Sequence, residues 1–188
     1  MKKLVALLLA GVVAASCMAC GTTEKKEEIK DATEVLTKAW DALADDQKFK
    51  AMGGDADNMT MDEPGKYNLE KAEEFGLENA YCFPEAELAK IDDAATLVHA
   101  MMANNFTAGA YHVTNASDVD GIVNALKDKT ANNRWMCGIP ETLLIVTVGD
   151  NYVVSAFGAN NIIESFKGGL TKAYGDVAKV VVEQPVVE

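Results

Sequence analysis

Residues 142–157 read TLLIVTVGDNYVVSAF, two apolar runs separated by Gly149-Asp150-Asn151. Gly, Asp and Asn favour tight turns, so this stretch predicts a β-hairpin with strands at 142–148 and 152–157. Both faces of each predicted strand carry apolar side chains. Strands with two apolar faces lie inside a sheet that is covered on both sides. We therefore place this hairpin at the centre of the fold.

The hairpin belongs to the second of two similar units, each with two strands followed by a helix. The first unit has strands at 95–103 and 106–114, a turn at Asn104-Asn105, and a helix that starts near Ser117. The helix of the second unit ends at Gly175. Apolar positions recur in both helices at spacings of three and four residues, and they are Val119, Ile122, Val123 and Leu126 in the first and Ile162, Ile163, Phe166 and Leu170 in the second.

Three further elements complete the predicted architecture. Residues 29–44 have the periodicity of an amphipathic helix, a short helix from Asn68 would end at Gly76, and a last strand at 179–183 precedes Pro185. We predict an α+β fold with a mostly antiparallel sheet of about five strands, built from two tandem ββα units, with packed helices and the N-terminal amphipathic helix. Residues 29–188 are long enough to form a single domain with a buried core.

The first twenty residues carry the pattern of an export signal. Lys2 and Lys3 precede an apolar run that is short for a membrane span, and small residues lead to Cys20. The site resembles the lipobox of bacterial lipoproteins, so we predict a signal peptide at 1–19 and a lipidated Cys20 with a charged tether at 20–28. The mature protein would be lipid-anchored on the extracytoplasmic face of the cell membrane. Cys17 is a second, less favoured site, and an ordinary cleaved signal is the alternative.

The composition is acidic and restricts the partners. The chain has 29 Asp and Glu against 17 Lys and Arg, a formal net charge of -12 at pH 7. Nucleic-acid binding needs a basic surface, so we expect no nucleic-acid partner. Acidity also disfavours docking of the protein surface on anionic lipid, which leaves attachment to the lipid anchor. We expect the membrane and an unknown protein, peptide or small ligand as partners, and no cofactor.

Two cysteines remain in the predicted mature domain, Cys82 and Cys137. They could form one disulfide outside the cell, act as reactive thiols, or be inert buried residues. Trp135 lies close to Cys137, as in some redox sites, but Pro140 follows and no Cys-x-x-Cys pattern is present. The alternatives for Trp135 are a residue packed over the core and a residue that faces a ligand.

An acidic loop offers oxygen ligands for a cation at Asp55, Asp57 and Asp62. The EF-hand pattern fails, because Met59 stands where a ligand is needed and Thr60 where glycine makes the turn. These residues are therefore weak metal candidates, and a solvated acidic loop is the favoured interpretation.

The only two histidines, His99 and His112, fall on neighbouring predicted strands. With a two-residue turn at Asn104-Asn105, His99 pairs with Ala110, and His112 lies diagonally on the same face roughly 7 to 8 Å away. No third ligand for a metal is found on these predicted strands. We expect a packed pair or two ligand-facing side chains.

Five segments resemble a family of lipoproteins of unknown function from Gram-positive, often gut-dwelling bacteria. They are MGGD at 52–55, KIDDA at 90–94, FTAGAYHV at 106–113, WMCG at 135–138 and VGD at 148–150. Some members carry the label bacteriocin transport accessory protein, and the resemblance, over most of 49–185, implies an accessory role at the cell surface with no catalytic residues to transfer.

Known catalytic patterns are missing from the sequence. It contains no Gly-x-Ser-x-Gly, no His-Glu-x-x-His and no glycine-rich nucleotide loop. We therefore expect a non-enzymatic binding or accessory module. The alternatives are a thiol-redox envelope protein that uses Cys82 and Cys137, and a cation-binding module that uses the loop from Asp55 to Glu63.

Overall fold

The computed structural model describes residues 28–136 and 138–187. Its described part contains an antiparallel sheet of eight strands in the order β2-β1-β4-β5-β7-β6-β8, with β3 paired to β4. The predicted α+β class is confirmed, whereas the predicted number of about five strands is wrong. The bounds of the strands are β1 Ala51–Gly53, β2 Thr60–Met61, β3 Gly65–Lys66, β4 Ile91–His99, β5 Phe106–Val113, β6 Thr142–Val148, β7 Tyr152–Gly158 and β8 Ala178–Pro185.

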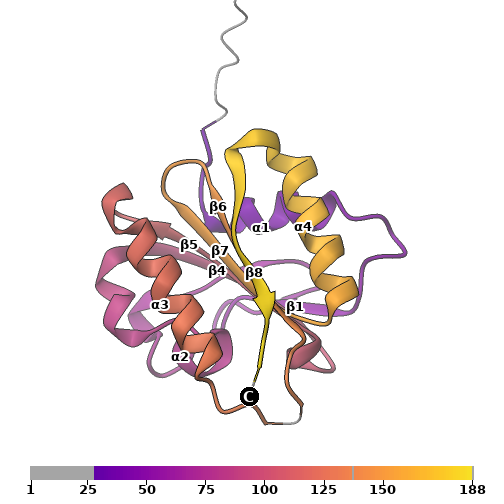
Figure 1. Cartoon of the computed structure of the whole chain (residues 1–188), viewed down its shortest axis with the longest axis horizontal. Helices are drawn as coiled ribbons and strands as arrows, with labels where there is room; N and C mark the ends of the chain where they lie inside the picture. The colour runs from indigo at the N-terminus through magenta and orange to yellow at the C-terminus, as the bar shows by residue number, and fades with distance from the viewer. Residues whose placement is uncertain (1–27, 137, 188) are drawn as a thin grey trace, which may run out of the picture.

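Helices lie on both faces of the sheet (Figure 1). The α-helices are α1 Ala32–Asp41, α2 Leu77–Tyr81, α3 Val119–Ala131 and α4 Asn160–Tyr174. Short stretches of 3-10 helix are η1 Leu69–Lys71, η2 Glu85–Lys90, η3 Ala103–Asn105, η4 Ala116–Asp118 and η5 Gly175–Val177. The helices α1 and α4 share one apolar core with one face of the sheet, and α2 and α3 share a second core with the other face.

The central hairpin forms as predicted from the sequence. Leu144 and Val146 of β6 belong to the core under α1 and α4, whereas Leu143 and Ile145 belong to the core under α2 and α3. All residues of β7 are buried. This two-sided burial agrees with a central position for β7, between β5 and β6.

The two ββα units place their helices on opposite faces because of how the strands run. The chain crosses from β5 through α3 to β6, and from β7 through α4 to β8, and in each crossover one antiparallel strand lies between the two that are joined. Both crossovers advance the same way across the sheet, but β5 and β7 point in opposite directions. Because such crossovers share one hand, their helices then lie on opposite faces. The two units therefore cannot be rotated onto one another as rigid bodies.

Three strands near one edge were missed, because β1, β2 and β3 have only two or three residues each and show no alternation. The helix predicted from Asn68 to Gly76 is also wrong. Asn68 does accept a hydrogen bond from the Glu70 N–H, but it caps only the 3-10 turn η1. Gly76 has a left-handed backbone (φ 71°) and precedes α2 instead of ending a helix.

The turn between β4 and β5 is longer than predicted, and it changes the register. The strand β4 ends at His99, and η3 lies between it and β5. Ala110 pairs with Ala95 rather than with His99, a shift of four residues. An even shift keeps every side chain on its predicted face, but it moves each side chain along the strand.

The strand β8 is at an edge, as its position before Pro185 indicated. The register shifts between Val180 and Val182, which leaves Val181 as an extra residue in this strand. Such a bulge bends an edge strand and interrupts its row of backbone hydrogen-bonding groups.

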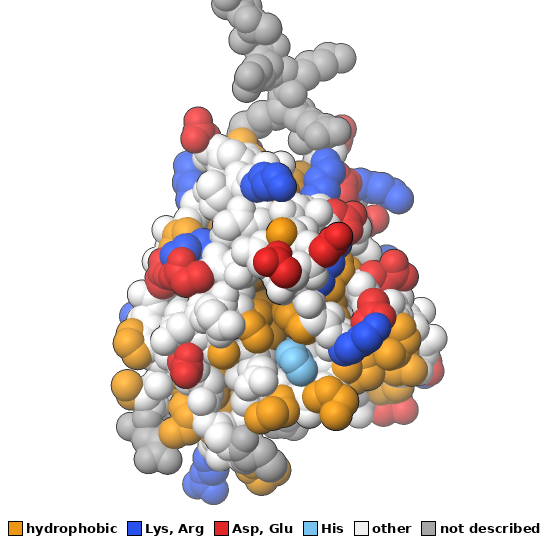
Figure 2. Space-filling model, turned by 90° about the vertical axis from the view of Figure 1, so that its right-hand side faces the viewer, with side chains coloured by type: hydrophobic (Ala, Val, Ile, Leu, Met, Phe, Trp, Pro, Cys, Tyr) orange, Lys and Arg blue, Asp and Glu red, His pale blue; other side chains and the backbone are white. Residues whose placement is uncertain are grey.

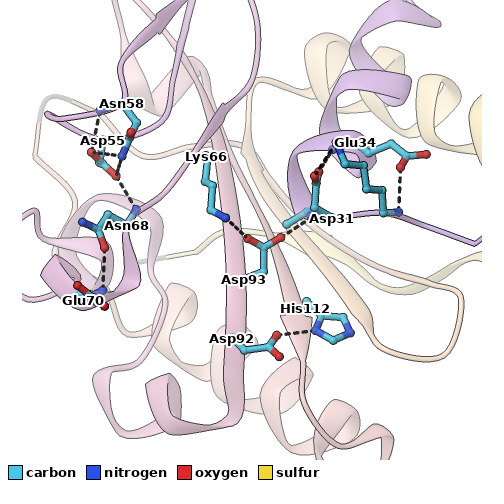
Figure 3. A network of polar contacts seen from close by, with 12 residues as sticks. Asp31, Glu34, Asp55, Asn58, Lys66, Asn68, Glu70, Asp92, Asp93 and His112 are labelled. Atoms are coloured by element: carbon cyan, nitrogen blue, oxygen red, sulfur yellow. Dashed lines mark hydrogen bonds and ion pairs between the residues drawn. The ribbon is translucent and has the colours of Figure 1, made fainter.

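Helix α1 is attached to β4 at its N-terminus (Figure 3). The side chain of Asp31 accepts a hydrogen bond from the Glu34 N–H at 2.8 Å, and Asp93 of β4 accepts one from the Ala32 N–H at 2.7 Å. Lys66 Nζ lies 3.4 Å from the other oxygen of Asp93. A carboxylate at a helix N-terminus also interacts favourably with the helix dipole, so Asp93 fixes the point where the chain enters the fold.

The close packing of α1 on α4 can be tested at two neighbouring glycines. A Cβ added to Gly169 would lie 2.4 Å from the carbonyl oxygen of Ala39, whereas nothing lies within 4 Å of one added to Gly168. We expect Gly169→Ala to lower the free energy of unfolding by about 1–3 kcal/mol through overpacking. Gly168→Ala should raise it by about 0.5–1 kcal/mol through helix propensity. Urea unfolding measures both, and stabilisation by both substitutions would contradict the described contact.

Candidate functional site

Two adjoining hollows lie on the face of the sheet that carries α2 and α3. The first has a volume of ≈ 280 Å³ and is lined by Met52, Met59 and Phe75 among others. The second has a volume of ≈ 690 Å³ and lies toward Trp135. Both are lined by Ala80, Tyr81 and Val98. We call the two hollows together the groove.

The groove forms where the helical cover of this face ends. Its floor is formed by the end of β4 with Val98, the start of β5 with Thr107 and the end of β7 with Phe157. One wall comes from the last residues of α2, and the other from the C-terminal end of α3 and the segment after it. The Asn104 side-chain amide donates to the carbonyls of Met136 at 2.8 Å and of Gly138 at 2.5 Å, which ties the turn before β5 to this segment.

The groove lies far from the point where the described chain begins. Asp93 binds the N-terminus of α1 near the start of β4. Val98 of the groove is five residues farther along this strand, which places it roughly 17 Å from Asp93 because a strand rises about 3.3 Å per residue. Figure 1 shows the start of the described chain at the top and α2 at the bottom. The groove and the start of the described chain therefore lie at opposite ends of the described part.

Apolar and aromatic side chains provide much of the lining. The Trp135 and Phe157 rings are 5.0 Å apart in an edge-to-face arrangement. Met59 and Met136 are 62% and 81% exposed, respectively. Methionine adapts its shape readily and is frequent at binding surfaces. Figure 2 shows hydrophobic side chains gathered on the lower half of the molecule, seen from the side of β1, and most charged side chains above them.

Most of the polar side chains that line the second hollow are amides and cations. They are Asn79, Asn104, Asn132, Asn133, Lys129 and Arg134, with the buried Thr107 in the floor, and none of the described residues that line it is acidic. Asparagine amides both donate and accept hydrogen bonds, which matches the groups of a peptide backbone. The hollow can therefore hold an apolar group and bind polar groups around it.

Two tyrosines, Tyr67 and Tyr81, line the first hollow. The Tyr67 and Tyr81 rings are 5.7 Å apart, and burial raises the pKa of both phenols. Among the described residues, the buried hydroxyls of Tyr67 and Tyr111 have no hydrogen-bond partner. Because these phenols stay protonated, each can donate a hydrogen bond, and Tyr67 is part of the groove lining.

Of the three residues predicted to face a ligand, Trp135 lines the groove and the two histidines do not. His112 pairs across the sheet with Asp93, six residues from His99, so the histidines are roughly 20 Å apart along β4 and not diagonal neighbours. The predicted proximity is wrong because the turn before β5 is longer than two residues. His99 stacks on Phe49 at 5.0 Å, and His112 Nδ1 lies 2.5 Å from the Asp92 carboxylate.

The three carboxylates of the acidic loop each have separate partners, and Figure 3 shows those of Asp55. Asp55 accepts hydrogen bonds from the backbone N–H groups of Asp57, Asn58 and Asn68. Asp57 pairs with Lys71, and Asp62 pairs with Lys50. No group of three metal-ligating side chains occurs in the described part of the chain.

Cys82 is a free and fully buried thiol. Burial raises its pKa to about 11, against a smaller opposite effect of a hydrogen bond with Thr130. The thiolate is the reactive form of cysteine, so this environment favours an inert thiol. Cys137, the signal peptide at 1–19, Cys20 and most of the tether lie outside the described residues. None of the described helices is long and apolar enough to cross a bilayer.

No family model, curated protein or solved structure matches the chain. The groove must therefore be interpreted from its own residues. Of the candidate residues that the sequence indicated, Trp135 lines the second hollow and Asp55 lines the first. Tyr81, Val98 and Arg134 were missed because they come from separate segments that show no local motif, and the run Asn132-Asn133-Arg134 was the one available signal.

Asp55 supports the loop that borders the groove, and its charge can be tested. Burial raises the pKa of this carboxyl, but hydrogen bonds from Asn68, Asn58 and Asp57 outweigh burial and lower the pKa. Since the folded-state pKa lies below the unfolded one, Asp55 stabilises the fold above about pH 4 and loses this effect as pH falls through the folded-state pKa. We expect Asp55→Ala to cost about 1–3 kcal/mol at pH 7 and less at pH 3.

Urea unfolding at the two pH values measures this difference. Asp57→Ala is the matched control, because an exposed ion pair contributes about 0–1 kcal/mol. Equal effects of the two substitutions at pH 7 would contradict the structural role of Asp55.

Proposed function

We propose that this protein is a non-enzymatic binding module that holds an apolar peptide segment in the groove, on the extracytoplasmic face of a bacterial cell membrane. The observation that carries the proposal is the continuity of the two hollows through Tyr81 and Val98. Sites for small ligands are typically apolar clefts of about 300–1,000 Å³ with a few polar groups, and the larger hollow is in this range.

The lining favours a peptide over a wholly apolar ligand. Asn79 and Asn133 can pair with the backbone groups of an extended segment. A ligand without such groups would leave these amides to lose their water without compensation. Val98, Trp135 and the exposed methionines provide apolar contact for its side chains.

The two alternative functions receive less support from the described residues. A thiol-redox role is disfavoured by the burial of Cys82 and by its raised pKa. A cation-binding role is disfavoured because Asp57 and Asp62 each pair with a lysine and Asp55 accepts backbone hydrogen bonds. The resemblance to surface lipoproteins with an accessory label agrees with a binding role.

Binding in the groove can be tested with a charge placed between the hollows. Ala80 is exposed on α2 and lines both of them. Ala86 is also exposed, and it lines neither. With a pool of N-acetylated apolar tetrapeptides as the probe, we expect Ala80→Glu to weaken binding about tenfold or more, because the carboxylate would occupy an apolar contact. Ala86→Glu should bind as the unmodified protein does.

Isothermal titration measures the affinity, and amide chemical shifts locate the site. The largest shifts are expected at Tyr81, Val98 and Asn133. Binding that Ala80→Glu leaves unchanged, or shifts confined to α4 and β8, would contradict the groove as the site.

The surface anchor has a separate test in a bacterial host that processes lipoproteins. We expect the intact mass of a chain that begins at Cys20 with a diacylglyceryl group, and recovery in the membrane fraction. Cys20→Ala should abolish both the added mass and the membrane retention. A soluble, unlipidated wild-type chain would make a freely secreted protein the better description.

A further inference from the structure

Arg134 is the only arginine in the chain, which has a net charge of -12. It follows α3, and it lines both the second hollow and an adjoining hollow of ≈ 390 Å³ that Ile139 and Val187 also line. Its side chain is exposed, and no ion pair or hydrogen bond joins it to another described residue. A planar guanidinium binds a carboxylate through two parallel hydrogen bonds.

The charges around Arg134 favour an anionic group at this position. Lys129, the other cation of the second hollow, is already paired with Glu78 at 2.8 Å. Among the described residues that line the second hollow, none offers a carboxylate that would compete for the guanidinium. Because the rest of the surface is mainly acidic, it repels anions, and the groove end is a local exception.

The C-terminal end of α3 carries partial negative charge and would oppose an anion nearby. This effect is reduced here by local hydrogen bonds. The Asp128 carbonyl accepts hydrogen bonds from both the side-chain amide and the backbone N–H of Asn132, at 2.8 and 3.1 Å, and the Thr130 carbonyl accepts one from the Asn133 N–H at 3.3 Å. The full charge of Arg134 therefore dominates at the mouth of the hollow.

We propose that the groove binds the C-terminal end of an extended apolar peptide, with its α-carboxylate on Arg134. The backbone would run past the amides of Asn133 and Asn79. An apolar side chain would then pass Tyr81 into the first hollow. This assignment rests on the proposed function and deepens it by naming the end of the peptide that is recognised.

A free fatty acid has the same two chemical features, a carboxylate and an apolar body. The asparagines distinguish the two ligands. The side chains of Asn104 and Asn132 already donate to backbone carbonyls, but the side-chain amides of Asn79 and Asn133 have no hydrogen-bond partner among the described residues. An acyl chain would desolvate these amides and offer them nothing, whereas a peptide backbone pairs with them.

The test compares two pools of N-acetylated apolar tetrapeptides that differ only at the C-terminus, one with free carboxylates and one with amides. We expect the wild-type protein to bind the acid pool about tenfold more tightly. Arg134→Gln should make the two pools bind equally. Arg134→Lys should keep only part of the preference, because an ammonium lacks the planar fork.

Lys179→Gln is the matched control, since it removes one positive charge from β8, away from the groove lining, and it should keep the full acid preference. Thermal unfolding of each variant confirms that the fold is intact, which is expected because both side chains are exposed.

The remaining outcomes separate the two proposals. Equal binding of both pools by the wild-type protein would overturn the role of the carboxylate and leave the groove as a peptide site. Failure of both pools to bind would overturn the proposed function as well. Binding of decanoate that depends on Arg134, without binding of either pool, would show that the occupant is a fatty acid and overturn the peptide assignment.

Discussion

Burial of the central strands on both faces is the constraint on which the rest of the structure depends. The strands β5, β7 and β6 carry apolar side chains to both sides, so each face of the sheet needs helical cover. The crossover from β5 to β6 and the crossover from β7 to β8 run in the same direction across the sheet, but they start from antiparallel strands. They therefore place one helix on each face. The cover is unequal, because α1 and α4 have 10 and 15 residues, whereas α2 has only five. The groove lies on the face with the shorter helix.

The sequence was a good guide where apolar periodicity extends over many residues. It predicted β6 with the correct bounds, the helices α1, α3 and α4, and the edge position of β8. It failed for β1 to β3, whose few residues are stabilised by pairing with distant segments. It also failed for the register of β4 and β5, because the length of the turn depends on contacts of Asn104 with a segment more than thirty residues away. Trp135 and Asp55 could be selected from the sequence as candidates, but their place in one groove could not, because the groove is formed by segments far apart in the chain.

Several acidic residues of this chain stabilise the fold by accepting hydrogen bonds from backbone N–H groups. Asp93 holds the N-terminus of α1, and Asp55 organises the loop beside the groove. Asp93 accepts a hydrogen bond from a backbone N–H 61 residues away in the sequence, and Asp55 accepts one from a backbone N–H 13 residues away. Some of the acidic residues therefore make long-range structural contacts, although the composition alone suggests a solvated surface. The two carboxylates illustrate why charge counts describe solubility and partners better than architecture.

The extra residue in β8 has a consequence for the protein in concentrated surroundings. An uninterrupted edge strand of eight residues, with Val180 and Val181 half-exposed, would offer a template on which a second copy could add its own strand. The bulge at Val181 breaks the spacing of the backbone groups along that edge, and Lys179 would add a charge to be buried. The last strand thus completes the sheet and at the same time resists its growth into polymers.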